Sequence, residues 1–587
     1  MRSTAPAQRR ASHPHSHLSH AVVLLMLGTA SGLSHAQTPG DIEAAARQAE
    51  QLQSQQRELI ERQRQEDVRS DAPPTRLQVA PRPLSERVST NCRQIHSISV
   101  SGVTLLRQGQ LDDLLAPYQG QCLGVAEIER ILGALTNAYI DKGYVAARAY
   151  LPAQDLSQGT LLIQVEEGRL KSIVVEDGGQ SSLWLPNLTP GMLDRPLDLR
   201  DLEQALDQIN RLRSNSATMD IAPGQAPGDS VVTFRNAPSR RLHLGATYDN
   251  YGQKATGQNQ LGANLALDNP FGLNDFVSFT HRRSQPYDTG RHSSYLSNLS
   301  YVVPFGYSTL SLGASTSEYA SILDAPSGAE LETYGNSKNY SARLDHVAWR
   351  GQDSMWTLSG SLTKKKNENY LEGILLEVSS RSLTVLDLDS SFTTRVLGGA
   401  LTLDAGVARG LTWFHALEDA DNLPDWAPRA QFTKLKYGVS FYRPFQVAGE
   451  NLSLNSAFYG QHALDTLYGS EQMSIGSPFT VRGFAETPLS GDHGHYLRND
   501  LSWLKPVALL GAQTLTLRPY LGADYGRVWN RVADVPEGEL SSVSVGLGVY
   551  LGPLSLDLLH SHPLSSPGFM DDDARGDSTF FNISLAI

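Results

Sequence analysis

In the C-terminal part of the chain, from about Arg240 onward, apolar residues alternate with small or polar residues in segments of roughly ten residues. The alternation is clear in Leu261–Leu267, in Val543–Leu551 and again in Phe581–Ile587. Clusters of Gly, Pro, Asn and Asp separate the segments. A strand of this length and period can cross a bilayer at a tilt, with one face on lipid. The pattern therefore predicts membrane-spanning strands.

The number of these segments indicates the architecture. About sixteen can be counted, an even number, as single-chain bacterial barrels require. We expect them to begin near Arg240, Gln258, Asn274, Arg291, Tyr307, Lys338, Asp353, Ser379, Gly398, Arg429, Glu450, Gly494, Ala512, Glu539, Pro553 and Ser578. A soluble β-helix or a tandem of sandwiches would bury its apolar face, whereas here the second face is Ser, Thr, Asn, Gly and charge. The sequence predicts a transmembrane β-barrel of about 16 antiparallel strands over residues 237–587, with a wet lumen.

Two compact α/β units are expected before the barrel, at residues 91–167 and 168–236. The first should contain the elements Ile95–Val100 (strand), Gln108–Leu115 and Val125–Lys142 (helices), and Gly143–Tyr150 and Thr160–Glu166 (strands). The second should contain strands at Leu170–Val175, Ala217–Ile221 and Ser230–Phe234, and a helix from about Pro196 to Arg213. Both units thus follow one plan, in which helices accompany a small sheet.

The first 36 residues are interpreted as a signal peptide. Three early arginines precede the short apolar stretch Ala21–Ala30, and Ser34–Ala36 offers small residues at the positions that signal peptidase reads. A membrane anchor is the alternative, but ten apolar residues are too few to span a bilayer. We therefore expect an exported chain whose mature N-terminus is Gln37.

Residues 37–70 are expected to form a polar helix. Asp41–Arg69 is rich in Ala, Gln, Glu and Arg and contains no Gly or Pro, which favours helix. Its apolar stripe is narrow, so the helix is either solvated or built to sit in an aqueous channel as a plug. Four prolines in Asp71–Pro83 indicate an extended linker at residues 71–90.

The net charge and the two cysteines limit the partners and the kinds of site that the chain can have. The formal net charge of -12 leaves no large basic face for phosphates, so nucleic acid is not expected as a partner. Cys92 and Cys122 are the two cysteines of an exported chain and are predicted to form a disulfide, worth about 3–4 kcal/mol by loop entropy. The two do not make a zinc-type ligand pattern, and no metal or other cofactor is expected.

A candidate site combines a loop and a strand. Ser477–Phe484 places Arg482 between a valine and a glycine inside a long turn-rich segment at about 463–492. In Tyr520–Trp529, alternation puts Asp524 on the polar face of its strand. If that face lines the lumen, a loop folded inward brings Arg482 to Asp524. The alternative is that Arg482 is solvated in a flexible loop.

Several ordered motifs resemble those of two-partner secretion (type Vb, TpsB) outer-membrane transporters of the ShlB/FhaC/HecB type. The α/β units, with Leu151–Leu156 in the first and Leu199–Gln204 in the second, are similar to polypeptide-transport-associated (POTRA) domains. Leu267–Gly272 matches the first barrel hairpin, and Val481–Phe484 and Gly522–Gly526 match the inward loop and its strand partner. One departure is the final residue, since such barrels more often end in Phe than in Ile.

The resemblance implies a pore of the bacterial outer membrane with its POTRA domains in the periplasm. The client would be a large secreted exoprotein, an adhesin, a haemolysin or a contact-dependent toxin, recognised while unfolded through its N-terminal secretion domain. Outer-membrane lipid and the barrel-assembly machinery are the other implied partners. The inward loop (Val481, Arg482, Gly483, Phe484), its strand motif (Gly522, Asp524, Gly526) and the plug helix would close the pore at rest, with an Arg482–Asp524 salt bridge holding the loop.

Two other classes compete with a transporter. A barrel-assembly factor usually carries more than two POTRA domains. A barrel enzyme could use Asp557, His560 and His562, but alternation puts Asp557 and His560 on opposite faces of one strand and no nucleophile motif accompanies them. No catalytic residue is therefore expected. A plain diffusion porin would not need the α/β units.

Overall fold

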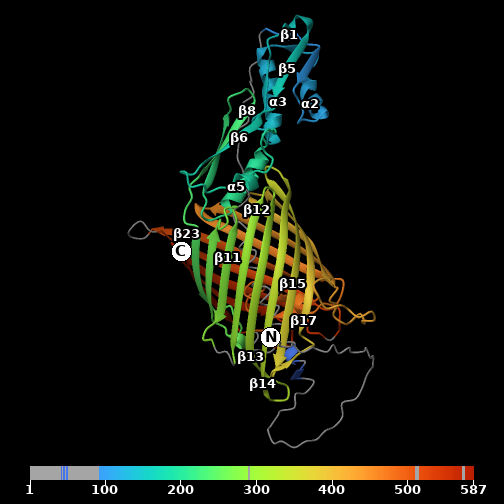
Figure 1. The fold of residues 1–587 in the computed structure, drawn as a ribbon, viewed down its shortest axis with the longest axis vertical. Helices are drawn as coiled ribbons and strands as arrows, with labels where there is room; N and C mark the ends of the chain where they lie inside the picture. The colour runs from blue at the N-terminus through green and yellow to red at the C-terminus, as the bar shows by residue number, and fades with distance from the viewer. Residues whose placement is uncertain are drawn as a thin grey trace, which may run out of the picture.

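The computed structural model describes residues 41–42, 44–46, 48–49, 91–287, 291–484, 486–508, 514–533, 535–570 and 576–587. The predicted signal peptide (1–36), most of the predicted plug helix (37–70) and the linker (71–90) lie outside these residues. Figure 1 shows an elongated molecule in which the α/β units extend from one end of a barrel. Within the described ranges, no helix is both long and apolar enough to cross a membrane.

Sixteen long strands of the described chain form a closed antiparallel barrel, as predicted. The strands are β9 (Leu242–Asp249), β10 (Gln260–Asp268), β11 (Phe276–Ser284), β12 (Ser293–Phe305), β13 (Ser308–Asp324), β14 (Glu330–Arg350), β15 (Ser354–Leu371), β17 (Arg381–Val396), β18 (Gly399–Leu411), β19 (Thr433–Val447), β20 (Glu450–Ala463), β23 (His493–Ala508), β24 (Thr514–Trp529), β25 (Gly538–Leu551), β26 (Leu554–Ser565) and β27 (Ser578–Ala586). β27 pairs with β9 and closes the ring. The short β16 (Ile374–Leu375) pairs with the end of β15.

Most strands begin close to their expected positions, but β14 begins at Glu330 rather than near Lys338. On the outer face, its first residues include Glu330, Glu332 and Asn336, whereas Leu331 on the lumen face is buried. They pair with the last residues of β13, from Glu330↔Asp324 to Asn336↔Glu318, and so extend that hairpin with a mostly polar outer face. The alternation from which the strand was predicted therefore starts only farther along it.

The two faces of the strands differ as a barrel in lipid requires. On β24, Leu521 is 61% exposed, whereas Asp524 is 4% exposed. On β25, Val543 and Val545 are exposed, and Ser542 and Ser544 are buried. Apolar side chains therefore face outward and small or polar ones face the lumen. The connections are short at the end that carries the α/β units and long at the opposite end.

The first α/β unit has a sheet of order β2-β5-β4. Its elements are β1 (Arg93–Gln94), β2 (Ser97–Ser101), α2 (Gln108–Leu115), η1 (Ala116–Tyr118), β3 (Cys122–Leu123), α3 (Val125–Asp141), β4 (Arg148–Tyr150), η2 (Leu156–Gln158) and β5 (Thr160–Glu166). Both helices pack on the sheet through one apolar cluster. The strand predicted from Gly143 begins only at Arg148, because Val145 turns away and packs into the core of the second unit.

The second unit repeats this arrangement with a sheet of order β6-β8-β7. Its elements are β6 (Arg169–Glu176), α4 (Leu185–Leu188), α5 (Leu199–Asn210), β7 (Ala217–Pro223) and β8 (Asp229–Asn236). Asp198 caps α5 by accepting a hydrogen bond from the Arg200 backbone at 2.8 Å. The helix ends at Asn210, earlier than the predicted Arg213.

Helix α5 joins the second unit to the barrel turns. The Tyr307 hydroxyl donates to Asp201 at 2.7 Å, and Arg350 Nη2 lies 2.7 Å from Asp207 Oδ2. Arg350 also donates to Gln204 at 3.0 Å. These buried polar contacts connect the helix to the β12–β13 and β14–β15 turns, so the unit is attached at the mouth of the barrel.

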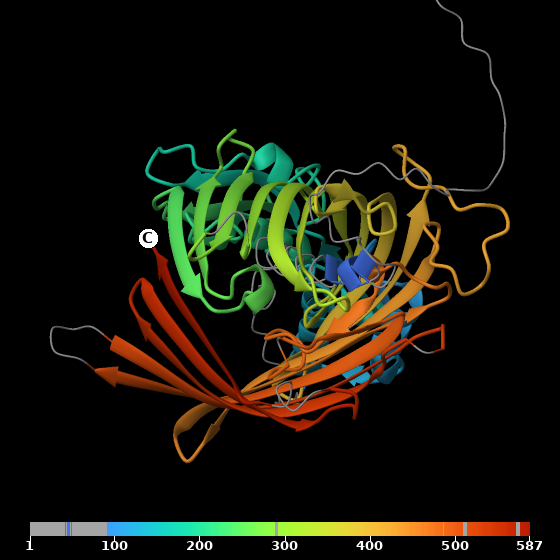
Figure 2. The same cartoon turned by 90° about the horizontal axis from the view of Figure 1, so that it is seen from below.

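The described N-terminal residues are helical and lie inside the barrel, where Figure 2 shows them in blue within the ring of strands. Ala45 packs with Leu331 and Leu371, and Ala49 packs with Tyr319. Gln48 donates to the Ser321 hydroxyl at 3.2 Å. These partners belong to the lumen faces of β13, β14 and β15, near the end opposite the α/β units.

Candidate functional site in the barrel lumen

The chain between β20 and β23, residues 464–492, folds into the lumen instead of projecting from the barrel. It contains η4 (Gly469–Glu471), β21 (Met473–Ile475), β22 (Leu489–Gly491) and, between these two strands, the motif around Arg482. β21 and β22 pair as a short hairpin from Met473↔Gly491 to Ile475↔Leu489. We call residues 466–471 the stem of this loop and residues 477–484 its tip.

At the tip, Arg482 is fully buried and binds Asp524 on β24. Its Nε donates to Asp524 Oδ2 at 2.6 Å, and its Nη2 donates to Oδ1 at 2.6 Å. The Arg482 backbone N–H also donates to Oδ2, at 3.1 Å. The guanidinium thus binds the carboxylate through two parallel hydrogen bonds, the bidentate geometry that is strongest for such a pair.

Asp500 on β23 is a second carboxylate for the same guanidinium. Arg482 Nη1 donates to Asp500 Oδ1 at 2.7 Å. Arg498 lies 3.4 Å from the other Asp500 oxygen and donates to the Pro478 carbonyl at 3.0 Å. The residues predicted from the sequence did not include Asp500 or Arg498. Alternation could have placed both on one face, but only the β23–β24 register puts Arg498 opposite Asp524 and Asp500 opposite Gly522.

The glycines of the strand motif make room for the tip. A Cβ on Gly522 would lie 2.3 Å from Arg482 Nη2, and one on Gly526 would lie 2.8 Å from Val481 Cγ2. Both glycines share the lumen face of β24 with Asp524, which lies between them. The Gly-x-Asp-x-Gly spacing therefore provides a carboxylate with a cleared space on each side.

The rest of the tip is fixed by one turn and one apolar cluster. Gly483 has φ +99°, a conformation that favours glycine, and its carbonyl accepts a hydrogen bond from Ser578 on β27 at 3.2 Å. Val481 and Phe484 are buried in a cluster that also contains Ile475, Leu489, Val528, Leu540 and Met570. Val481 directly precedes Arg482, so this apolar cluster borders the charged pair.

The other predicted residues lie elsewhere. Cys92 and Cys122 form a disulfide in the first α/β unit, with Cα atoms 5.3 Å apart. Asp557 faces the lumen and accepts hydrogen bonds from Arg518 at 3.0 Å and from the Tyr520 hydroxyl at 2.8 Å. His560 and His562 contact Asp577 instead, so the structure does not bring these histidines to Asp557.

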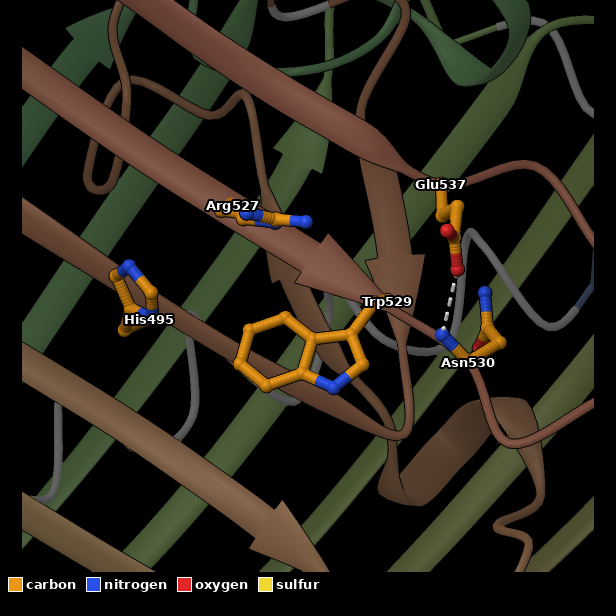
Figure 3. A pocket seen from close by; sticks show the side chains of 5 residues that line it. All are labelled: His495, Arg527, Trp529, Asn530 and Glu537. Atoms are coloured by element: carbon orange, nitrogen blue, oxygen red, sulfur yellow. Dashed lines mark hydrogen bonds between the residues drawn. The ribbon is translucent and has the colours of Figure 1, made fainter.

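A pocket of about 400 Å³ lies at the far rim of the barrel, lined by His495, Arg527, Trp529, Asn530 and Glu537 (Figure 3). Arg527 and Trp529 alternate with the lumen residues of β24, so they belong to its outer face. Arg527 lies 3.2 Å from Glu539 and stands over the Trp529 ring. This pocket is separate from the buried pair in the lumen.

Known proteins share this arrangement. The family model for the haemolysin secretion/activation protein ShlB/FhaC/HecB matches residues 228–549, an ShlB-type POTRA domain matches 94–168, and a further POTRA domain matches 169–223. The chain belongs to the ShlB/FhaC/HecB family. It is an outer-membrane transporter of the two-partner secretion type, and its POTRA domains lie in the periplasm.

Individual relatives support the family over almost the whole chain. The Escherichia coli outer membrane transporter CdiB is 36% identical over 540 residues, covering 91% of this chain and 89% of the relative. The Serratia marcescens hemolysin transporter protein ShlB is 35% identical over 494 residues, covering 84% of this chain and 85% of the relative. The solved structure of CdiB from Escherichia coli superposes with a TM-score of 0.82 at 33% identity and covers 94% of this chain and 100% of that chain.

Proposed function

We propose that this transporter carries a large unfolded exoprotein from the periplasm through its barrel to the cell surface. The inward loop and the N-terminal plug helix close the lumen at rest. The observation that carries the proposal is the fully buried Arg482, held by carboxylates of the barrel wall. Each wall carboxylate projects from a lumen face, so the contact exists only while the loop is inside.

The salt bridge acts as a positional contact more than as a source of net stability. Taking two charges out of water offsets much of their attraction, whereas removing one partner from a buried pair costs about 3–5 kcal/mol. Arg482 therefore specifies where the loop rests. Val481, Gly483, Phe484, Gly522 and Gly526 serve the same role by shaping the space around the pair.

The client is recognised by backbone pairing at the POTRA domains. Each sheet has edge strands, β2 and β4 in the first domain and β6 and β7 in the second. An extended segment of the exoprotein's N-terminal secretion domain pairs with such an edge through backbone hydrogen bonds. This pairing depends on an extended conformation more than on a particular sequence. Relatives named hemolysin transporters favour a haemolysin-type client, with an adhesin or contact-dependent toxin as the alternatives.

The energy for export comes from folding of the exoprotein outside the cell, which traps it there. The sequence contains no phosphate-binding loop motif that would couple transport to a nucleotide. The transporter itself is inserted into outer-membrane lipid by the barrel-assembly machinery. Its role is transport rather than catalysis.

A barrel-assembly factor is the second candidate function, because such factors share the POTRA-and-barrel plan. The family match and the relatives named as transporters favour secretion. Crosslinking discriminates the two functions. Photoreactive groups in β2 and β7 should capture N-terminal fragments of the exoprotein encoded beside this chain, and capture of nascent outer-membrane proteins instead would favour the assembly factor.

Substitution Arg482→Ala tests the closed-state role. Secretion of the cognate exoprotein should fall strongly, while heat-modifiable mobility of the barrel stays normal because no strand is altered. Arg527→Ala, which removes an arginine from the outer face of β24, is the control and should secrete normally. Normal secretion by a correctly assembled Arg482→Ala protein would remove this role. If a variant that lacks the plug helix conducts no ions in a planar bilayer, the proposal that the barrel is a pore is wrong.

A further inference from the structure

The stem of the inward loop carries a second buried charge, which the family motif does not include. Glu471, the last residue of η4, is 1% exposed. Its Oε1 lies 2.6 Å from Lys365 Nζ on β15, and its Oε2 lies 3.2 Å from Lys434 Nζ on β19. Lys434 Nζ also donates to the Glu471 carbonyl, at 2.7 Å. One carboxylate of the loop is thus bound by two ammonium groups of the wall.

Neighbouring stem residues bind the same part of the wall. The guanidinium of Arg381 on β17 stands 3.9 Å from the centre of the Tyr468 ring. Leu467 packs in a buried cluster with Val385, Ala408, Phe432 and Ala463. The stem therefore contacts β15 to β20, whereas the tip contacts β23, β24 and β27. The two attachments lie on different parts of the ring.

The stem contact is not needed to hold the wall together. Lys365 and Lys434 are on strands separated by β17 and β18, and each strand pair there is joined by its own ladder of backbone hydrogen bonds. A buried carboxylate is tolerated only where it is paired. The ion pairs of Glu471 therefore determine the position of the loop and are not required for the stability of the wall.

A second carboxylate, Asp387, lies on the same part of the barrel wall as these two lysines. Asp387 lies on β17, between β15 and β19 in the ring, and binds Lys436 at 2.7 Å. Lys436 also binds Asp389, at 2.8 Å, so it keeps a partner if Asp387 turns to another cation. Asp387 is level with Ala408 of β18, which is in turn level with Lys434 of β19. Lys365 is opposite Leu383, farther along the same face of β17. A lysine is a flexible point charge that can change partners by rotating its stem.

We propose that Glu471 is a second anchor of the inward loop, and that Asp387 takes over Lys365 and Lys434 when the loop leaves the lumen. The exchange replaces one buried ion pair by another, so the wall is left with no unpaired ammonium group in the open state. The proposal rests on the proposed function only in requiring that the loop moves out to open the pore.

Amide substitutions of the two carboxylates give opposite expectations. Glu471→Gln keeps the side-chain shape and removes the anchor, so the loop should leave the lumen more often. Asp387→Asn removes the alternative partner, so the loop should leave less often than in the wild type. Lys434→Met breaks the anchor from the wall side and should act in the direction of Glu471→Gln. Glu418→Gln, an exposed carboxylate between β18 and β19, is the matched control.

Two readouts report the position of the loop in the full-length protein. One is the frequency of ion-conducting openings in planar bilayers. The other is maleimide labelling of Ser474→Cys in β21, because both native cysteines are in the disulfide. Glu471→Gln should raise both by roughly tenfold, equivalent to about 1.4 kcal/mol. Asp387→Asn should lower both, and Glu418→Gln should leave both unchanged.

The outcomes separate this anchor from the proposed function. Wild-type behaviour of both Glu471→Gln and Lys434→Met, in a protein whose plug-helix deletion conducts ions, would overturn the anchor and leave the pore intact. An increase caused by Asp387→Asn would overturn the exchange of partners. Absence of conductance in every variant, the plug-helix deletion included, would count against the pore and so against the proposed function.

Discussion

The tip and the stem of the inward loop both place a buried charge against the barrel wall, but with opposite sign and different chemistry. At the tip the loop supplies the cation, Arg482, and the wall supplies Asp524 and Asp500. At the stem the loop supplies the carboxylate, Glu471, and the wall supplies Lys365 and Lys434. The same loop is thus attached by a rigid fork at one end and by two flexible point charges at the other.

This difference indicates different tasks. The guanidinium fits one geometry, and Gly522 and Gly526 clear a space that suits only this position of the tip. The lysines of the stem can follow a moving carboxylate or turn to Asp387. A contact that specifies one resting position and a contact that can be exchanged together suit a loop that must be held firmly and still be released.

Exchange between arginine and lysine should give the largest contrast between the two regions. Arg482→Lys keeps the charge but loses the paired bonds to Asp524, at a cost on the order of 3 kcal/mol to the inward position of the loop. Lys365→Arg keeps a cation on a long stem at a partly exposed site, and Lys434 still binds Glu471, so this variant should change little. Secretion assays should show a strong defect for Arg482→Lys alone. Equal defects in the two variants would contradict the contrast.

A methyl group at the tip should have the next largest effect. Gly522→Ala would place a Cβ 2.3 Å from Arg482 Nη2 and displace the guanidinium. We expect a cost of about 1–3 kcal/mol to the inward position and more frequent openings in planar bilayers. Gly360→Ala on β15 is the control, since its nearest atom would lie at an ordinary 3.6 Å. Unchanged openings in Gly522→Ala would mean that the clearance is unimportant.

Loss of the stem's aromatic contact should have a smaller effect. Tyr468→Leu removes the ring beneath Arg381 while keeping an apolar side chain. A cation–π contact to a partly exposed ring is worth about 0.5–1 kcal/mol, which is less than the about 1.4 kcal/mol expected for Glu471→Gln. Labelling of Ser474→Cys should therefore rise by less in Tyr468→Leu than in Glu471→Gln. The reverse order would indicate that Tyr468, rather than the carboxylate, is the main attachment of the stem.

The smallest effect is expected outside the barrel, at the partly buried Glu167 of the first POTRA domain. Burial raises the pKa of Glu167, but hydrogen bonds from Thr104, Tyr139 and Leu105 outweigh it and hold the pKa below its usual range. Glu167 should thus stabilise the domain above pH of about 4, with the contribution lost as pH falls through the lowered pKa. Hydrogen exchange of α3 should be faster in Glu167→Gln at neutral pH, and this difference should shrink in acid. A difference that persists in acid, or an equal effect of the exposed Glu129→Gln, would contradict this role.

Much of the fold could be predicted because strand alternation and helix composition are local properties. The positions of α2 and of most barrel strands, and the lumen side of Asp524, all follow from the direction in which each side chain leaves its backbone. The prediction was wrong where local pattern and tertiary role diverge. The local pattern predicts Val145 as part of a strand, but its side chain packs in the core of the second POTRA domain. The start of β14 was missed because its outer face is mostly polar and its buried Leu331 faces the lumen, the reverse of the pattern expected for a strand in lipid.

By itself, then, the sequence determined the positions of most barrel strands and which of their side chains face the lumen, and it singled out Arg482 and Asp524 as a pair. It did not determine that Asp500 completes the site of Arg482, because that depends on the register between β23 and β24. Nor did it reveal the partners of Glu471, which come from strands 106 and 37 residues away along the chain. Such contacts arise only when the barrel closes and the loop folds into it, since ring closure and loop placement bring together charges that no local pattern connects.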